Sequence, residues 1–326
     1  MKLLLTGATG KVGQAFLPRF LAENRFADWE VVALCNNRVV EETARVSVVK
    51  GSLANQEVIS TALSGVTHIM HMAAVKESPE MAIDVAVKGM FLMLEEFRKS
   101  PDSQQFILIG GDCSVGHIFH DYHAPITERS PRKAYPGCYA LTKVIEEVML
   151  EQYGIQYGLP GCILRAPWIM EKDDFKYVMS FGFDQFGGPP WSDYISAEDV
   201  DRHFQAGAVP LMRDHAGKPL LRNFVHVDDL VGAALAALDS PKANCETFNI
   251  SMNQPVNYGE FAEFMQQTRA LPAADIATPH YSNWLDNSKA RHLLGWTPKV
   301  NMEGLIERAW SHIRDPNDPR KIWYPG

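Results

Sequence analysis

Short apolar runs alternate with helix-like stretches along the first half of the chain. The runs lack an alternation of polar and apolar positions, which is typical of strands that are buried on both faces of a sheet. They cover Lys2–Thr6, Val31–Cys35, Val46–Val49, His68–Met72 and Phe106–Ile109. The stretches between them that favour helices are Val12–Glu23, Gln56–Leu63 and Pro79–Lys99.

The repeated alternation predicts an α/β fold of the Rossmann type, which is a doubly wound parallel sheet with helices on both faces. The ligands of such sheets lie beyond the carboxyl ends of the strands. Three segments should therefore meet at one cleft. They are the turn after Thr6, the stretch after Met72 and the stretch after Ile109.

The pattern becomes less regular after Leu164, and the segment Phe181–Trp191 is rich in glycine, proline and aromatic residues. Strands are predicted at Leu220–Val225 and Thr247–Ile250, and helices at Ala197–Gln205, Val227–Leu238, Tyr258–Gln267 and Met302–Ile313. We expect residues 1–165 to form the sheet core. Residues 166–326 should form mainly a smaller lobe over the cleft, with some segments that return to the core.

The composition narrows the class of partner. Of 326 residues, 46% are hydrophobic and 21% are charged, and the net charge is −8. No dense cluster of lysine and arginine is present, so neither nucleic acid nor an anionic membrane is expected as a partner. The longest apolar helix-like run, Leu230–Leu238, is too short to span a bilayer.

The N-terminus and the cysteines favour a cytoplasmic location. An apolar run at residues 3–5 leads directly into a glycine turn, so a secretory signal is not expected. The cysteines are odd in number and scattered, without a Cys-x-x-Cys pair, which favours reduced thiols over disulfides or a zinc site. They are Cys35, Cys113, Cys138, Cys162 and Cys245.

Gly7, Gly10 and Gly13 stand between a predicted strand and a predicted helix. Glycine allows a tight turn and a close approach of the backbone to a pyrophosphate. The N-terminus of the following helix offers N–H groups and the positive end of its dipole. In this context the spacing predicts a dinucleotide site. An ordinary strand-to-helix turn is the alternative.

Tyr139 and Lys143 lie four residues apart, which places them on one face of a helix. A free tyrosine titrates near pH ~10, too high for a good base at neutral pH. An adjacent ammonium would lower the pKa of the phenol and make it an acid and base for the interconversion of an alcohol and a ketone. An incidental pair on an exposed helix is the alternative, and the glycine turn favours catalysis.

These motifs resemble the extended short-chain dehydrogenase/reductase family, the epimerase/dehydratase group, over nearly the whole chain. Residues 6–13 are similar to its TGxxGxxG fingerprint, and residues 71–74 to its HxAA strand end, which borders the nicotinamide. Residues 223–230 resemble its "fvHVdDla" segment and residues 294–298 its late LGWxP segment. The resemblance implies that residues 1–165 bind NAD or NADP and that residues 166–326 form mainly a substrate-binding lobe.

The resemblance also implies which residues bind the cofactor. They come from the glycine turn, from the ends of several strands and from the catalytic helix. They are Gly7, Thr9, Gly10, Lys11, Val12, Gly13, Asn36, Arg38, Ser52, Leu53, Met72, Ala73, Ala74, Lys143 and Pro167.

The chain departs from the family pattern at several cofactor positions. The acid that closes the second strand is replaced by Cys35, the adenine-side aspartate by Ser52 and the helix asparagine by Ala86. The missing acid no longer repels a ribose 2′-phosphate, and Arg38 and Lys11 would attract one. NADP is therefore expected to be accepted, and it is slightly favoured over NAD.

Asp112 aligns with the serine or threonine that in the family hydrogen-bonds the reacting oxygen, and Ser114 follows two residues later. We expect Ser114 to donate to this oxygen, because charge shifts onto it during the reaction, and Asp112 to orient the substrate or Tyr139. The dehydratase Asp-Glu pair is not matched here, which argues against a standard 4,6-dehydratase. The expected catalytic residues are Tyr139, Lys143, Ser114 and Asp112.

Further residues are expected at the substrate. In the family an arginine at the position of Arg222 often binds a substrate phosphate, and a solvated arginine at a strand end is the alternative. An aromatic ring such as that of Trp168 can stack on a sugar, and a place in an aromatic-rich core of the lobe is the alternative. The expected substrate residues are Lys76, His117, Trp168 and Arg222. The loop histidines His117, His120 and His123 include an alternative donor to the substrate oxygen. No metal site is predicted from them, because a fourth ligand and a fixed geometry are lacking.

The predicted function is an NAD(P)-dependent oxidoreductase or epimerase that acts on a secondary alcohol of a sugar, a sugar acid or a nucleotide sugar. The alternative is an NAD(P)-binding sensor with little catalysis, which the departures favour and the presence of both Tyr139 and Lys143 disfavours. The stretch Pro79–Lys99 is more apolar than one face of a sheet requires. In the family this helix and the tyrosine helix often form a dimer interface, so a homodimer is expected.

Overall fold

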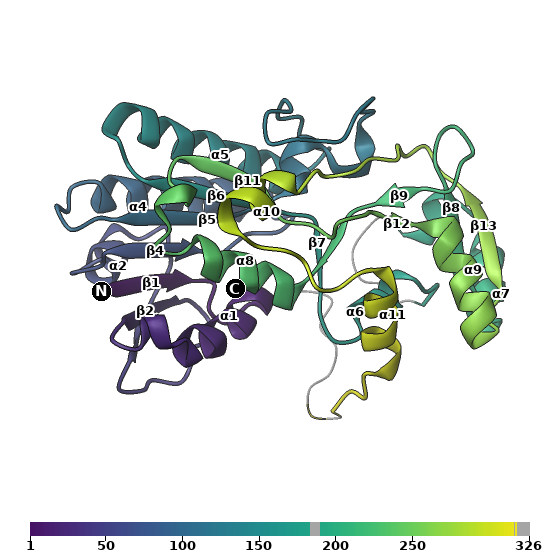
Figure 1. The fold of residues 1–326 in the computed structure, drawn as a ribbon, viewed down its shortest axis with the longest axis horizontal. Helices are drawn as coiled ribbons and strands as arrows, with labels where there is room; N and C mark the ends of the chain where they lie inside the picture. The colour runs from purple at the N-terminus through teal and green to yellow at the C-terminus, as the bar shows by residue number, and fades with distance from the viewer. Residues whose placement is uncertain (183–189, 316, 318–326) are drawn as a thin grey trace.

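A seven-stranded sheet forms one half of the molecule in the computed structural model, which describes residues 1–182, 190–315 and 317 (Figure 1). The strand order is β11-β6-β5-β4-β1-β2-β3, and every neighbouring pair is parallel. The predicted Rossmann-type sheet is therefore confirmed. The strands are β1 (Lys2–Thr6), β2 (Glu30–Cys35), β3 (Val46–Lys50), β4 (His68–His71), β5 (Gln105–Gly111), β6 (Gly161–Ala166) and β11 (Glu246–Asn249).

Alternate residues of β1 enter different cores, since successive side chains of a strand point to opposite faces of the sheet. Leu3 and Leu5 pack with Phe16 of α1 (Lys11–Ala22) and with α8 (Val227–Ala237). Leu4 packs on the other face with residues of α2 (Gln56–Ala62), α4 (Gly89–Phe97) and α5 (Cys138–Tyr157). Burial on both faces explains why these strands lack polar alternation.

The predicted helix Pro79–Lys99 is not a regular α-helix throughout. Its first turn is α3 (Pro79–Met81), residues Ala82–Lys88 form a π-helix, and α4 follows. Gly89 is required at the junction with the sheet, because a Cβ atom there would lie 2.8 Å from the Cβ of Leu53. This contact holds the start of α4 against the segment that follows β3.

The second half of the chain builds a lobe with its own core, which includes Phe175, Phe224 and Phe261 (Figure 1). Three two-stranded sheets pair β7 with β10, β9 with β12 and β8 with β13. The strands are β7 (Trp168–Met170), β8 (Val209–Arg213), β9 (Leu221–Arg222), β10 (Phe224–His226), β12 (Val256–Asn257) and β13 (Ala273–Ala277). The helices are α6 (Asp174–Val178), α7 (Ala197–Gln205), α9 (Tyr258–Arg269) and α11 (Met302–Ser311).

The single strand predicted at Leu220–Val225 is wrong, because the segment divides into β9 and β10, which belong to different sheets. Asn223 separates the two strands. Its side-chain amide donates to Asn283 Oδ1 at 2.9 Å, and its side-chain oxygen accepts from the N–H of Leu285 at 3.0 Å. These long-range bonds occupy the residue at which the chain passes from one sheet to the other.

Several C-terminal segments return to the sheet. Strand β11 pairs with β6, helix α8 packs against α1, and α10 (Ser288–Leu294) lies beside β11. Within the predicted irregular segment Phe181–Trp191, residues 183–189 lie outside the described residues. Among the helices that the structure describes, none has the length and apolarity needed to cross a membrane.

Candidate active site

The glycine turn between β1 and α1 has a shape that only glycine allows at two positions. Gly7 has a φ of +71°, and a Cβ atom there would lie 2.6 Å from the backbone nitrogen of Ala73. A Cβ atom on Gly13 would collide with the carbonyl oxygen of Gly7. The turn is therefore packed tightly against both the end of β4 and the first turn of α1.

The same turn leaves the N-terminus of α1 available to an anion. Gly10 is the N-cap and has no side chain to occupy the first N–H groups, and the first turn contains no acid. A Cβ atom on Gly10 would meet only the carbonyl oxygen of Gly7, at 3.3 Å. Since a helix N-terminus attracts phosphate groups, the turn fits the pyrophosphate of a dinucleotide, with Thr9 and Val12 as its neighbours.

A hydroxyl joins the glycine turn to the strand end predicted to border the nicotinamide. Thr6 Oγ1 lies 2.6 Å from His71 Nδ1 and accepts from the N–H groups of Met72 and Ala73 at 3.2 and 3.3 Å. These bonds bring Met72, Ala73 and Ala74 to the edge of the sheet beside the turn. The structure thus brings together two of the three segments expected at the cleft.

Lys11 is not placed to attract a 2′-phosphate. Its ammonium is buried, lies 2.5 Å from Asp174 Oδ2 in α6 and donates to the carbonyl of Ile169 at 2.9 Å. The side chain therefore links the core to the second lobe. The expected attraction of Lys11 for the cofactor is corrected to this structural contact.

The end of β2 lacks an acid, as the sequence indicates. The strand ends at the buried Cys35, Asn36 is exposed, and the side chain of Arg38 is half-buried. Ser52 and Leu53 follow β3, and Pro167 is buried between β6 and β7.

Tyr139 and Lys143 begin α5, but the lysine does not support the phenol as expected. Lys143 Nζ donates to Glu146 Oε2 at 2.7 Å and to the carbonyl of Ile109 at 3.3 Å. Burial, together with the charges of Cys113 and other acidic groups, raises the pKa of Tyr139 well above its ordinary value. The expected lowering of this pKa by Lys143 is therefore corrected.

A second lysine contacts the phenol. Lys76 Nζ lies 4.0 Å from the centre of the Tyr139 ring. Lys76 is exposed as a residue, yet its ammonium turns inward over this ring, and loss of hydration lowers its pKa to about 8. Lys76, which was expected at the substrate, thus lies beside the predicted acid and base.

Cys113 and Tyr135 were missed as neighbours of Tyr139. Cys113 is buried, and its sulfur lies close to Gly111 at the end of β5, where an added Cβ atom would be 2.9 Å from it. The charges of Cys113 and Tyr135 both raise the pKa of Tyr139. The only sequence signal for Tyr135 is its position four residues before Tyr139. Because that position precedes α5, helical spacing alone does not reveal the proximity.

Ser114 is not placed to donate to a substrate. Its hydroxyl is completely buried, 2.7 Å from Glu147 Oε1 and 2.9 Å from the carbonyl of Gly111, so its single proton is used inside the protein. Glu147 also accepts from Arg165 at 3.1 and 2.8 Å and from Arg132 at 3.0 Å. The predicted catalytic role of Ser114 is therefore corrected to a role in this buried network.

Asp112 orients a histidine rather than the substrate or Tyr139. Asp112 Oδ2 lies 2.6 Å from His117 Nδ1, and Arg222 Nε donates to His117 Nε2 at 3.0 Å. Because an arginine can only donate, His117 must be neutral with its proton on Nδ1. Burial agrees with this state, since it lowers the pKa of His117.

His117 is held from several sides. Its backbone is left-handed with φ +46°, and its carbonyl accepts from the side chain of Asn283. His117 is 4% exposed and Arg222 is 6% exposed, so both side chains are buried where they meet. A strained backbone that persists under such constraints is common at functional sites.

The side chains of Arg222 and Trp168 pack against each other. The guanidinium carbon of Arg222 lies 3.4 Å from the centre of the Trp168 ring, and Tyr258 hydrogen-bonds to Arg222. The pair joins β7 to β9, which belong to different two-stranded sheets. Of the four expected substrate residues, the structure therefore brings together His117, Trp168 and Arg222.

The remaining loop histidines face elsewhere. His120 Nε2 lies 3.2 Å from the carbonyl of Ala134, and His123 is exposed with its Nδ1 3.8 Å from Asp121. In the part of the chain that the structure describes, no group of three or more potential ligands could hold a metal ion.

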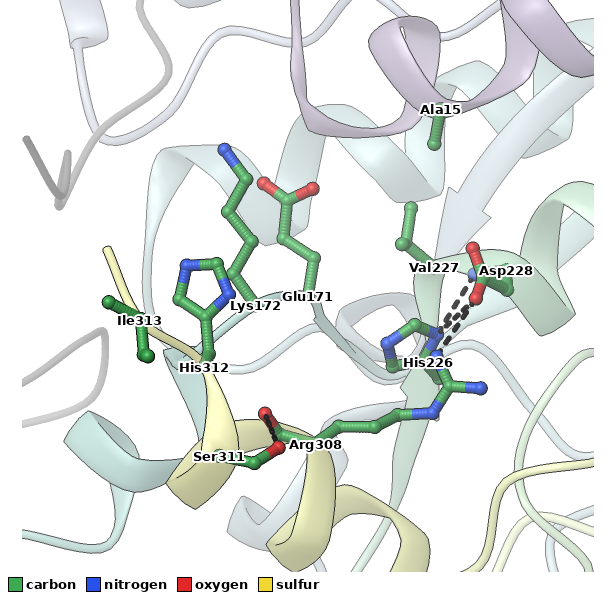
Figure 2. A pocket seen from close by; sticks show the side chains of 10 residues that line it. All are labelled: Ala15, Glu171, Lys172, His226, Val227, Asp228, Arg308, Ser311, His312 and Ile313. Atoms are coloured by element: carbon green, nitrogen blue, oxygen red, sulfur yellow. Dashed lines mark hydrogen bonds and ion pairs between the residues drawn. The ribbon is translucent and has the colours of Figure 1, made fainter. Parts of the chain in front are cut away.

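A cavity of about 640 Å³ is lined by residues of α1, of the start of α8 and of the end of α11 (Figure 2). Its polar wall comes from His226, Asp228 and Arg308, with Asp228 Oδ2 3.1 Å from Arg308 Nη1. Glu171, Lys172 and His312 are among the other residues that line it (Figure 2). None of the predicted site residues lines this cavity, so it is separate from the cleft at Tyr139.

The sequence profile of the NAD dependent epimerase/dehydratase family matches residues 3–170. UDP-glucuronate 4-epimerase 4 of Arabidopsis thaliana is 24% identical over 94% of this chain and 74% of its own length.

Two solved structures have a similar fold. A short-chain dehydrogenase/reductase superfamily protein from Agrobacterium tumefaciens with bound NAD has a TM-score of 0.76 and 20% identity, over 95% of this chain and 96% of its own. UDP-glucuronic acid 4-epimerase from Bacillus cereus in complex with NAD has a TM-score of 0.72 and 18% identity, over 95% and 97%.

Proposed function

The chain belongs to the NAD dependent epimerase/dehydratase family, and we propose that it is an NAD(P)-dependent enzyme that acts on a secondary alcohol of a sugar, a sugar acid or a nucleotide sugar. The observation that carries the proposal is that contacts tie the helix of Tyr139 and the glycine turn to neighbouring strands. Lys143 donates to the carbonyl of Ile109 in β5, and Thr6, just before the glycine turn, contacts His71 at the end of β4, which pairs with β5. The names of the relatives favour a nucleotide sugar among these substrates.

In the proposed reaction the chain moves a proton at one oxygen. Tyr139 exchanges this proton with the substrate: its phenolate takes a proton from a hydroxyl, or its phenol gives one to a carbonyl oxygen, while the ammonium of Lys76 supplies positive charge beside the ring. Gly7, Gly10 and Gly13 would hold the pyrophosphate of the cofactor. When bound, the nicotinamide supplies reversible acceptance of a hydride, which serves an epimerase and a dehydrogenase equally.

Arg222 is proposed to bind an anionic group of the substrate. Its Nε is used by His117, and its plane lies against Trp168, so the guanidinium has a fixed orientation. Such a group can bind a phosphate or a carboxylate through its terminal N–H groups. A sugar acid or a nucleotide sugar satisfies this site better than an uncharged sugar.

NADP is proposed to be accepted as well as NAD. No carboxylate closes β2, so nothing there repels a 2′-phosphate, and Arg38 follows Cys35 closely. Titration of the purified protein with both cofactors tests the proposal by calorimetry. NAD binding at least tenfold tighter than NADP would contradict the slight preference for NADP that the sequence predicts.

A homodimer is proposed on the exposed side of α5. Leu141, Val148 and Ile155 are exposed apolar residues at intervals of seven, which places them in one row along the helix. Phe91 of α4 is also exposed. Light scattering should give the mass of a dimer for the wild type and of a monomer for Ile155→Glu, whereas a monomeric wild type would exclude the dimer.

All five cysteines are free thiols in the structure. A reducing compartment would keep them so, which supports our proposal of a cytoplasmic location.

The experiment that tests the function offers the protein NAD or NADP with UDP-glucuronate, UDP-glucose and free glucuronate. Absorbance at 340 nm reports a dehydrogenase, and the proton NMR spectrum of the sugar reports an epimerase. Tyr139→Phe should slow turnover by at least ~100-fold while cofactor affinity changes little. Tight binding of the cofactor with no conversion of any substrate would instead favour the sensor, which the pairing of Lys143 with Glu146 also favours.

A further inference from the structure

A row of three buried side chains connects the end of β5 to the second lobe. Asp112 and His117 lie in the segment that follows β5, and Arg222 is the last residue of β9. Asp112 Oδ2 lies 2.6 Å from His117 Nδ1, and Arg222 Nε donates to His117 Nε2 at 3.0 Å. The imidazole therefore stands between a carboxylate and a guanidinium and contacts both.

The backbone around the histidine holds the ring at this place. His117 has a φ of +46°, a conformation that is uncommon outside glycine and that asparagine, aspartate and histidine adopt most readily. Its carbonyl accepts from the side chain of Asn283, and the carbonyl of Ile118 accepts from the N–H of Tyr281 at 2.9 Å. Both donors belong to the segment between β13 and α10. The segment after β5 is therefore bonded to a distant part of the chain on either side of the imidazole.

The guanidinium of Arg222 keeps donors that these contacts do not use. Its carbon lies 3.4 Å from the centre of the Trp168 ring, and the phenol of Tyr258 accepts from it. A guanidinium carries five N–H donors, and among the described residues only His117 and Tyr258 accept from the side chain of Arg222. Since buried polar groups usually have hydrogen-bond partners, the terminal N–H groups of this arginine suit an anionic ligand.

Asp112 determines which nitrogen of the imidazole faces the arginine as an acceptor. An ionised carboxylate only accepts, so Asp112 holds the imidazole proton on Nδ1 and leaves Nε2 bare. The other tautomer would place an N–H of the ring against the N–H of Arg222. The carboxylate thus fixes the tautomer, and the tautomer fixes the edge of the guanidinium that faces the ring.

The intervening histidine also preserves the donors of the arginine. A carboxylate in direct contact with a guanidinium often takes two parallel N–H groups. Among the described residues no carboxylate forms an ion pair with Arg222, because Asp112 acts through a neutral ring that accepts from Nε alone. The arginine is therefore oriented while its terminal nitrogens and its charge remain available to another anion.

We propose that Asp112 and His117 are positioning residues for substrate binding: Asp112 fixes the tautomer of His117, and His117 orients Arg222 so that its terminal N–H groups bind an anionic group of the substrate. The position that aligns with the reactive serine or threonine of the family serves substrate binding in this chain. The anion is a phosphate of a nucleotide or the carboxylate of a sugar acid. The inference rests on the proposed role of Arg222 and adds the residues on which its affinity depends.

The test compares two replacements of the histidine. His117→Asn suits the left-handed backbone and can still donate to Asp112, but its shorter side chain does not reach Arg222. His117→Gln extends an amide oxygen toward the place of Nε2 and can still accept from Arg222. Calorimetry with the NAD-saturated protein gives the Kd of UDP, UDP-glucose and UDP-glucuronate. The affinity should fall by about tenfold or more in His117→Asn, the effect of one hydrogen bond to a charged group, and by less than about threefold in His117→Gln.

The three nucleotides distinguish the two anions. A loss of affinity that is common to all of them assigns Arg222 to a phosphate, whereas a loss confined to UDP-glucuronate assigns it to the carboxylate. The affinity for NAD should stay unchanged in both variants. His292→Asn, at an exposed position of α10, is the matched control and should leave every one of these affinities unchanged.

A spectroscopic measurement checks the geometry without a substrate. In NMR spectra of the protein labelled with ¹⁵N-histidine, His117 should show a protonated Nδ1 and a bare Nε2, and its signals are assigned by their loss in His117→Gln. Asp112→Leu removes the acceptor of the Nδ1 proton. This variant should shift the proton toward Nε2 and weaken nucleotide binding as His117→Asn does, and it replaces His117→Asn in the comparison if that variant does not fold.

Equal affinity of the wild type and His117→Asn for all three nucleotides would overturn the proposal, and so would a protonated Nε2 in the wild type. An equal loss in His117→Gln and His117→Asn would overturn it as well, because the acceptor at Nε2 would then not matter. Failure of both His117→Asn and Asp112→Leu to fold would assign the row to folding instead. Weakened nucleotide binding in an enzyme that converts no substrate removes the proposed function and leaves the positioning role intact.

Discussion

Replacement of Ser114 by alanine separates a catalytic hydroxyl from a structural one. The sequence predicts a donor to the substrate, whereas the structure buries the hydroxyl between Glu147 and the carbonyl of Gly111. Ser114→Ala should therefore change turnover by less than about twofold. It should lower the free energy of unfolding instead, because a hydrogen bond to a buried charge is lost.

The magnitude follows from the partners that remain. Glu147 would still accept two bonds from Arg165 and one from Arg132, so its charge stays paired. Only one hydrogen bond to a charged group is removed, and such a bond contributes about 1.5–3 kcal/mol. We expect a loss of about 2 kcal/mol, well below the cost of an unpaired buried carboxylate.

Two assays on the same preparation decide the matter. Urea denaturation gives the free energy of unfolding, and steady-state kinetics give kcat and KM. Ser64→Ala, at an exposed turn after α2, is the matched control. It should change neither the free energy of unfolding nor the kinetic constants. A decrease in kcat of more than tenfold with unchanged stability would refute the structural assignment and restore Ser114 to the reaction.

Three further predictions concern buried ionisable side chains. Arg165→Met removes the main partner of Glu147, both side chains being almost fully buried, and should cost about 3–5 kcal/mol in urea denaturation; a loss below about 1 kcal/mol would contradict the predicted importance of the pair. Lys11→Met leaves Asp174 buried without its cation and should cost a similar amount, most of which Lys11→Met/Asp174→Leu should restore in the same assay. Burial lowers the pKa of His68 and His280 to about 4 and that of His71 to about 3. Because the unfolded chain binds these protons near pH ~6.5, stability should be complete above that pH and fall as the pH decreases toward 4, which urea midpoints between pH 7 and 4.5 would show; a flat profile would mean that the histidines are not buried as neutral groups.

The first half of the fold could be predicted because its pattern is determined locally. A parallel strand that is covered on both sides must be apolar at consecutive positions, as in Leu3, Leu4 and Leu5, so a short window of sequence is sufficient. The glycine turn is similar, since the positive φ of Gly7 and the contact of Gly13 with the carbonyl oxygen of Gly7 are both set within a few residues. These features need no knowledge of the remainder of the chain.

The second lobe could not be predicted to the same extent, since its shortest strands depend on partners far away in sequence. Strand β9 contains only Leu221–Arg222, and it pairs with β12, Val256–Asn257. Two residues carry too little periodicity to indicate a strand. The break at Asn223 depends on Asn283 and Leu285, about sixty positions later, so no local window contains the reason for it.

In the candidate site too, the sequence indicates where residues lie but not which side chains they contact. Glycine and helical spacing indicate where Tyr139 and Lys143 lie, but the sequence does not say which acid binds the lysine. Glu146 and Glu147 are adjacent on α5, yet burial raises the pKa of the first, whereas Arg165 holds that of the second below its ordinary value despite burial. Successive helical residues point about 100° apart, so Glu146 faces Lys143, and Glu147 faces a loop and a neighbouring strand. The acid that pairs with Lys143 therefore depends on a rotation of one residue along the helix, and only the packing around α5 determines it.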